Sequence, residues 1–447
     1  ANIFNYYVDS LIIIKAQTIL LSKKIEINTQ AFYEFPSIRG LAEYISIKNE
    51  VHNVTHTEFL RDISTIQKEN PYSRKTYKNI LLFGVTGFLG IHILYYLLKN
   101  TNSNIYCIIR EKDNLNAIER FENKFKFYFD KETLEKYESR IITITGNLLK
   151  ENFGISQEVF DEFLPNIDCV IDSAALVKHY GNYDFKKTNV EGTAKVIDFC
   201  CKNNLPLHYI STMSISGYGL VKTPNVEFDE NSFYIGQNVE DNVYVRSKFE
   251  AENLILQACK TNNLIASIYR IGNITNRFSD GFFQQNAGDN AFLNRVSSII
   301  NLGCIPEELK NINFELSPVD YCALFIVNLL QNVPKNINIY HIYNEQKFTI
   351  SQFLHTLEHF NINLKTTTLD EFKKILFNSK DSHFGIINYV DNIDNSDLHN
   401  IRLSNNLTNQ TLDAMNLKWP DITDEYIKKI LDYLSKNNFI GGTYEKR

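Results

Sequence analysis

Residues 79–100 read NILLFGVTGFLGIHILYYLLKN: an apolar run, a glycine-rich turn and an amphipathic stretch. This order predicts a β-strand, a tight turn and an α-helix. Gly84, Gly87 and Gly90 have the G-x-x-G-x-x-G spacing, which lets the backbone turn tightly, approach a pyrophosphate and pack helix against strand. The helix N-terminus adds partial positive charge. A tight turn without a ligand is the alternative, but the flanking strand and helix favour a dinucleotide site.

The chain beyond this stretch alternates between apolar runs and helical stretches. Six runs read as strands: NILLF, NIYCIIR, RIITITG, DCVIDSA, LHYIST and LIASIYR. Strands that are apolar throughout, with helices between them, indicate a parallel sheet covered on both faces. We therefore predict an α/β fold, a Rossmann-type doubly wound parallel sheet, over residues 77–345. Residues 346–447 are mainly helical and include TISQFLHTLEHF and DEYIKKILDYLSKN, so we expect a smaller C-terminal subdomain there.

The segment before the sheet has a different character. Residues 1–50 read as short helices, one after Asp9-Ser10 and one at PSIRGLAEYI. Residues 51–76 are polar and read as a linker. Because the chain begins without Met, we expect it to be part of a longer polypeptide.

The composition excludes several classes of protein. The chain is 44% hydrophobic and 22% charged, with a net charge of −6, as in globular proteins. No block of Lys and Arg stands out, so we expect neither nucleic acid nor a membrane as a partner. The seven Cys form no C-x-x-C pair. We therefore expect no disulfide framework, no metal and a reducing, cytoplasmic location.

The end of the second strand predicts the type of cofactor. Twenty positions after Gly90, where an NAD enzyme has an acid on the ribose 2′-hydroxyl, the chain has Arg110. A guanidinium there can form charge-assisted bonds to a 2′-phosphate, and Arg120 is a possible second contact. Two solvated surface arginines are the alternative. The pattern favours NADPH over NADH.

A tyrosine and a lysine four positions apart predict the chemistry. Tyr244 and Lys248 share one helical face, and an ammonium near a phenol favours the phenolate. Such a pair also occurs on surface helices without function. Ser211 and Thr212 end the apolar strand LHYIST, at the sheet edge where ligands bind. Thr212 can there polarise a substrate carbonyl, whereas Ser211 can equally cap the strand end.

Further motifs give a specific resemblance. Residues 79 to about 345 resemble the extended short-chain dehydrogenase/reductase superfamily. They are most similar to the terminal thioester reductase domains of nonribosomal peptide synthetases and the related carboxylic acid and aminoadipate reductases. The matching stretches are GVTGFLG, IIR with Arg120 downstream, GNLL, DSAALVKHYGNYDFKKTNVEGT, YISTMS, YVRSKFEAE, YRIGNITN and SPVDYCA. The helical C-terminal part is similar to the substrate-side subdomain of this family.

The resemblance implies roles for individual residues. Thr212, Tyr244 and Lys248 would form the catalytic triad. The NADPH contacts would be Gly84, Thr86, Gly87, Phe88, Leu89, Gly90, Arg110, Arg120, Asn147, Leu148, Ala174, Ala175 and Leu176, together with Tyr244 and Lys248. Asn147 stands where the family usually has Asp, and its carbonyl can still accept a hydrogen bond from the adenine amino group.

Ser10 has two compatible interpretations. In YYVDSLIII, residues 6–14, its hydroxyl can cap a helix. D-S-L, the following amphipathic helix and AFYEFPSIRGLAEYI also resemble the latter part of a peptidyl or acyl carrier domain, whose serine bears 4′-phosphopantetheine. Tyr7 and Val8 replace the usual glycine pair, and the first carrier helix is absent. We expect Ser10 both to cap the helix and to carry this group.

Together these features predict an NADPH-dependent thioester reductase. It would release a carrier-bound peptidyl or acyl thioester, supplied by upstream modules of the same synthetase, as an aldehyde or, after a second reduction, an alcohol. The alternatives are a non-redox Dieckmann-type release domain, a nucleotide-sugar epimerase or dehydratase, and a binding module without turnover. Retention of Tyr244 favours redox chemistry, because the Dieckmann-type relatives typically lack this tyrosine.

Overall fold

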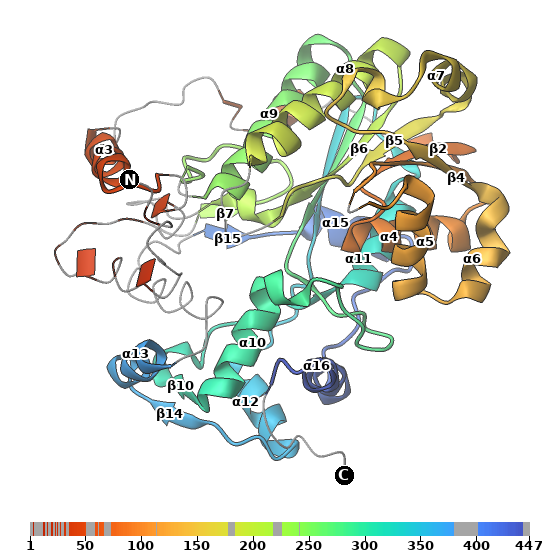
Figure 1. Ribbon diagram of the computed structural model, residues 1–447. Helices are drawn as coiled ribbons and strands as arrows, with labels where there is room; N and C mark the ends of the chain where they lie inside the picture. Colours follow the sequence, from red (N-terminus) through yellow and green to blue (C-terminus); the bar gives the residue numbers. More distant parts are fainter. Residues whose placement is uncertain are drawn as a thin grey trace.

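Figure 1 shows the computed structural model of the chain. It describes residues 35–50, 59–60, 62–66, 73–112, 114–177, 184–217, 226–240, 242–379 and 401–440, together with scattered positions before residue 35. Ser10 lies outside the described residues.

A seven-stranded parallel sheet forms the centre of the molecule (Figure 1). In spatial order its strands are β13 (Ile337–Ile342), β8 (Ala266–Ile271), β6 (Leu207–Thr212), β5 (Cys169–Asp172), β2 (Asn79–Phe83), β3 (Asn104–Ile109) and β4 (Ile141–Thr145). All neighbouring pairs are parallel. The chain winds outward in one direction from β2 to β4 and in the other from β5 to β13. The predicted Rossmann-type, doubly wound sheet is confirmed.

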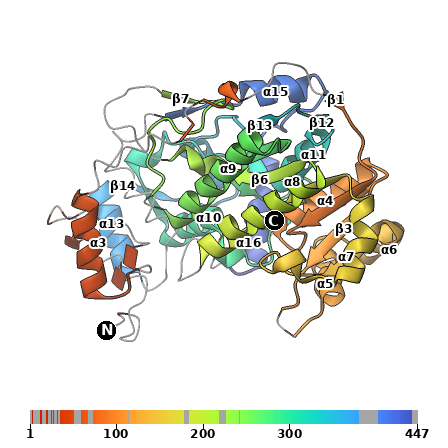
Figure 2. The ribbon, with the colours of Figure 1, turned by 90° about the horizontal axis from the view of Figure 1, so that it is seen from above.

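Helices cover both faces of this sheet. One face packs against α7 (Gln157–Phe163), α8 (Gly192–Asn203) and α9 (Val243–Thr261). The other packs against α4 (Phe88–Asn100), α5 (Ala117–Tyr128) and α11 (Val319–Leu329). The short helix α6 (Lys131–Tyr137) follows α5. Figure 2 shows α5, α6 and α7 together near β3, on the opposite side of the molecule from α3 and α13.

A third apolar cluster belongs to the smaller C-terminal part. Its helices are α10 (Ala291–Leu302), α12 (Ile350–His359), α13 (Leu369–Asn378) and α16 (Asp424–Lys436). Strands β10 (Cys304–Pro306) and β14 (Lys365–Thr367) pair in parallel beside them. The predicted helices at TISQFLHTLEHF and DEYIKKILDYLSKN are confirmed, and a capping box of Thr349 and Gln352 starts the first of them.

The smaller part is interleaved with the larger one. Residues 283–316 already contribute to its cluster, before β13 returns to the central sheet. Farther along, β15 (Ile401–Leu403) pairs with β7 (Val226–Phe228), and α15 (Asn406–Asp413) packs on the larger part through Leu412. Packing therefore crosses the boundary that we predicted at residue 345, because the chain returns to the larger part between the segments of the smaller one.

The N-terminal segment has a small apolar cluster of its own. Helix α3 (Ile38–Glu50) contributes Leu41, which packs with Ile13, Ile27 and Phe32. The helix predicted at PSIRGLAEYI is confirmed. Among the described residues, no helix combines the length and the apolar character that crossing a bilayer requires.

Candidate active site

The glycine-rich loop meets the loop after β5 at the carboxyl edge of the sheet. Gly84 has φ +80, and a side chain at this position would overlap the carbonyl of Ser173. A side chain at Gly90 would overlap the carbonyl of Gly84. Both glycines are therefore required by close backbone approaches. β2 and β5 lie next to each other where the strand order reverses, and such switch points bind ligands in doubly wound sheets.

Helix α4 begins at this crevice with free backbone donors. Its N-cap is Gly87, and no described side chain caps it, so the first N–H groups are available to an anion. Within 4 Å, a methyl group at Gly87 would meet only the Gly84 carbonyl oxygen, at 3.1 Å. The side chains of Phe88 and Leu89 pack into the apolar cluster around α4. The cofactor contacts that we predicted for these two residues would therefore be made by their backbone groups. Thr86 lies within the loop and is half-buried.

The two predicted arginines lie next to each other beyond β3. Arg110 is exposed directly after the last residue of the strand, Ile109. Arg120, on α5, donates a hydrogen bond from its guanidinium to the backbone carbonyl of Arg110. A capping box of Asn116 and Glu119 starts α5 and sets the place of Arg120. Two positive side chains thus share the edge at which we predicted the 2′-phosphate.

Asn147, which we assigned to the adenine of the cofactor, lies in the turn after β4, and its side-chain oxygen already takes part in a hydrogen bond of that turn. Asn147 accepts a hydrogen bond from the Leu149 N–H at 3.0 Å through Oδ1. The oxygen has a second lone pair, so its use in the turn leaves one position for a ligand. Leu148 lies against Gly192 at the start of α8. Both residues are half-buried at the carboxyl edge of the sheet.

The loop after β5 is tied to the helix that carries Tyr244. The N–H of Ala174 donates to Asp172 Oδ1 at 3.0 Å. Asn189 accepts from the Leu176 N–H at 2.7 Å, and its own amide donates to the Leu176 carbonyl and to Ser247 Oγ at 2.9 Å. Sequence reasoning assigned no role to Asn189, although it lies inside the quoted motif KKTNVEGT. The feature of the sequence that could have indicated a role for Asn189 is its place: it is a polar residue on the helix that follows the predicted cofactor loop.

Tyr244 and Thr212 come together as predicted. Asn242 caps α9 by accepting from the Val245 N–H at 3.1 Å, and Tyr244 follows in the first turn. Burial raises the pKa of Tyr244 to about 12, while a hydrogen bond with the Thr212 hydroxyl lowers it. Thr212 also accepts from the Ser214 N–H at 3.1 Å. The hydroxyl of Ser211 is buried and has no hydrogen-bond partner among the described residues.

The contacts of Lys248 differ from those that we predicted. We predicted that its ammonium would lower the pKa of Tyr244. Instead Lys248 donates to the Tyr209 hydroxyl at 2.6 Å and to the Ile210 carbonyl at 2.7 Å, and the lowering contact on Tyr244 comes from Thr212. The reason is geometric: the lysine turns toward β6, which supplies two acceptors. Burial lowers the pKa of Lys248 to about 8, although Asp172 and Glu252 oppose this shift.

A buried ion pair fixes α9 to the sheet. Arg270 on β8 and Glu252 on α9 are both 0% exposed. The Arg270 guanidinium donates to Glu252 at 2.9 Å and to the Ser232 carbonyl at 2.8 Å, and it lies 3.0 Å from Nε2 of His341 on β13. Glu252 lies one turn beyond Lys248. The position of α9, which carries Tyr244 and Lys248, therefore depends on this pair.

Comparison with known proteins agrees with the fold. The model of an NAD-binding family described as "Male sterility protein" matches residues 82–326, from the end of β2 into α11. The chain belongs to this family, which lies within the extended short-chain dehydrogenase/reductase superfamily. It is an oxidoreductase with a nicotinamide cofactor site.

Individual proteins that are similar to the chain point to one group within this superfamily. A thiolation-reductase di-domain from an archaeal non-ribosomal peptide synthetase is 32% identical, with a TM-score of 0.82, over 100% of this chain and 94% of that chain. A linear gramicidin synthase chain of Brevibacillus parabrevis is 26% identical over 95% of this chain, and the large chain of the L-2-aminoadipate reductase of Candida glabrata is 24% identical over 80%. The present chain spans 8% and 28% of the lengths of these two relatives. The predicted resemblance to synthetase reductase domains is confirmed.

Proposed function

We propose that the chain reductively releases a carrier-bound peptidyl or acyl thioester as an aldehyde, with NADPH as the hydride donor. The observation that carries this proposal is the pairing of Tyr244 with Thr212 at the carboxyl end of β6, beside the glycine-rich loop of a family of nicotinamide-binding proteins. The relatives with thiolation and reductase domains support the substrate class.

NADPH fits the residues of the site. The uncapped N-terminus of α4 suits the pyrophosphate, and the neighbouring Arg110 and Arg120 suit the 2′-phosphate. The loop of Ala174, Ala175 and Leu176, held by Asn189, would lie along the cofactor. When bound, the cofactor supplies a hydride to the thioester carbonyl.

The side chains then stabilise charge and move a proton. Tyr244 and Thr212 donate hydrogen bonds to the carbonyl oxygen, on which negative charge develops. Burial keeps Tyr244 protonated, so its hydroxyl is a proton donor. The tetrahedral hemithioacetal collapses when its hydroxyl is deprotonated and the pantetheine thiolate leaves, which gives the aldehyde and, after protonation, the free thiol.

The choice between NADPH and NADH is expected to depend on Arg110. Replacing it with alanine removes charge-assisted hydrogen bonds to the 2′-phosphate, so NADPH affinity should fall by about 10- to 100-fold while NADH affinity stays the same. Fluorescence titration with each cofactor measures both. Arg74→Ala, at another exposed arginine, serves as the control. If Arg110→Ala loses the same affinity for NADPH and for NADH, this side chain does not bind the 2′-phosphate.

The carrier role of Ser10 is part of the same proposal. The described part of the N-terminal segment has its own apolar cluster around α3, and the match to the thiolation-reductase di-domain extends over this segment. A tethered substrate reaches the reductase at a high effective concentration. We therefore propose 4′-phosphopantetheine on Ser10, with upstream modules of a synthetase as its source of acyl groups.

One experiment tests the proposed function. Purified protein is given NADPH and an acyl-pantetheine thioester, and the loss of NADPH absorbance and the released product are followed, the latter by mass spectrometry. We expect an aldehyde or alcohol. Cyclisation of a carrier-bound chain without NADPH consumption would support the Dieckmann alternative instead. In a second arm, a phosphopantetheinyl transferase with coenzyme A should add mass to the protein, but not to Ser10→Ala.

A further inference from the structure

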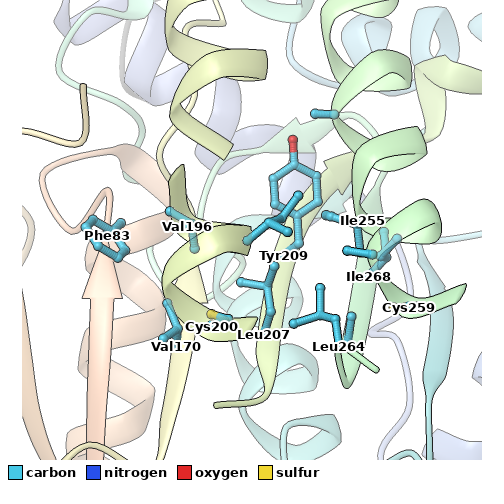
Figure 3. Packing of buried hydrophobic residues seen from close by; sticks show 14 of the residues in the cluster. Phe83, Val170, Val196, Cys200, Leu207, Tyr209, Ile255, Cys259, Leu264 and Ile268 are labelled. Carbon is cyan, nitrogen blue, oxygen red and sulfur yellow. The ribbon is translucent and has the colours of Figure 1, made fainter. Parts of the chain in front are cut away.

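Four buried polar side chains lie between the sheet and the helices α8 and α9. They are Asp172, Thr193, Tyr209 and Lys248, each no more than 2% exposed. Asp172 and Tyr209 are register partners on the neighbouring parallel strands β5 and β6, so both point to the same face of the sheet. The Tyr209 hydroxyl is hydrogen-bonded to Thr193 as well as to Lys248. In Figure 3 this hydroxyl points away from the apolar side chains of Leu207 and Leu264.

Among the described residues, only one carboxylate of this polar cluster is not already paired with another cation and can therefore balance the charge of Lys248. A buried ammonium needs an anion close to it, and two carboxylates, Asp172 and Glu252, stabilise its charged form. Glu252 already forms the buried ion pair with Arg270. Asp172 is therefore the carboxylate whose charge is left to balance that of Lys248.

The hydrogen bonds agree with this assignment. Two of the three ammonium donors of Lys248 go to Tyr209 and to the Ile210 carbonyl. Asp172 accepts from Ala174 through Oδ1, whereas Oδ2 is buried without a partner among the described residues. A third donor and a free acceptor thus remain in the same polar cluster.

We propose that Asp172 is the counter-ion and positioning residue of Lys248, and that Tyr209 holds the ammonium against β6. The negative charge of Asp172 keeps Lys248 charged, while Tyr209 and the Ile210 carbonyl hold its ammonium at β6. Only the effect of this charge pairing on turnover rests on the proposed function; the charge pairing itself does not.

The pH range follows from the groups that face Lys248. Burial raises the pKa of Asp172 to about 6 and lowers that of Lys248 to about 8, so both are charged between these values. Burial raises the pKa of Tyr209 and of the nearby Cys200 well above their ordinary values, and these groups stay neutral. Tyr244, at about 12, does so too. Asp172 and Lys248 are therefore the two groups of this cluster whose charges define the pH range.

The test is an NMR titration of the Lys248 ε-methylene signal in the protein without added cofactor, assigned by its loss in Lys248→Met. Asn at position 172 can still accept from the Ala174 N–H, so the loop is preserved. In Asp172→Asn we expect the midpoint of Lys248 to fall by about one to three pH units. The alkaline limb of kcat should move in the same direction. Asp320→Asn, at a buried carboxylate that caps Phe278 and Ser279, should leave the midpoint unchanged.

A double-mutant cycle gives a second readout that needs no turnover. Asp172→Asn, Lys248→Met and the double variant are unfolded in urea at pH 7. We expect the combined effect of the single substitutions on the unfolding constant to exceed that of the double variant about tenfold. Additive effects together with an unchanged Lys248 midpoint would overturn the proposal. If the native protein reduces no thioester but the Lys248 midpoint is shifted in Asp172→Asn, the proposed function is overturned and the charge pairing stands.

Discussion

Tyr244→Phe is expected to reduce kcat for an acyl-pantetheine thioester by about 100- to 10,000-fold, the range for loss of a positioned proton donor. The hydroxyl lies with Thr212 at the end of β6 and is kept protonated by burial. Phenylalanine retains the ring and its packing, so the affinity for NADPH and the unfolding midpoint should change little. Stopped-flow measurement of NADPH oxidation, combined with cofactor titration, separates the two effects.

Tyr77→Phe is a matched control for this result. Tyr77 is buried, and its hydroxyl lies 3.4 Å from His208, on the other face of the sheet from the partly buried Tyr244. Its loss should leave kcat unchanged. Full turnover in Tyr244→Phe would remove this residue from the mechanism and leave Thr212 as the main donor to the carbonyl oxygen.

Arg270→Met is expected to destabilise the protein by about 3–5 kcal/mol, the cost of breaking a buried ion pair by removing one partner. The substitution leaves the Glu252 carboxylate buried without its cation, and it removes the donor to the Ser232 carbonyl. Urea unfolding followed by circular dichroism gives the free energy of unfolding. Since Glu252 lies one turn beyond Lys248, a fall in kcat should accompany the loss of stability.

The double variant Arg270→Met/Glu252→Met is the control for this prediction. It removes both charges, so it should be more stable than Arg270→Met although it carries one more substitution. If Arg270→Met unfolds at the same urea concentration as the native protein, the pair does not hold α9 on the sheet.

Much of the sheet could be predicted because its strands are apolar throughout. β13 was not among the six predicted runs, since INIYHI carries Asn338 and His341 within it. The structure explains how His341 is accommodated: Nδ1 lies 2.6 Å from the Ser404 carbonyl and Nε2 lies 3.0 Å from Arg270. Both partners are far away in the sequence, and no local pattern points to them.

The candidate site shows the same limit. The glycine spacing and the Tyr244–Lys248 pair are local patterns, so the sequence alone was enough to predict a site from them. The partner of Lys248 depends instead on the register between β5 and β6, which places Asp172 beside Tyr209. A register between strands whose connection includes a helix cannot be read from a single sequence. Asp172 and Asn189 were therefore quoted within motifs without a role.

The interleaved packing of the smaller C-terminal part has a consequence for engineering. Among the described residues, its apolar cluster draws on segments within 283–316, 348–376 and 422–440, and the chain returns to the larger part between them. The smaller part of a relative cannot be exchanged into this chain by a single crossover near residue 345, because such a chimera would combine segments from two different clusters. A working chimera has to exchange all three segments together and keep the recipient's own sheet between them.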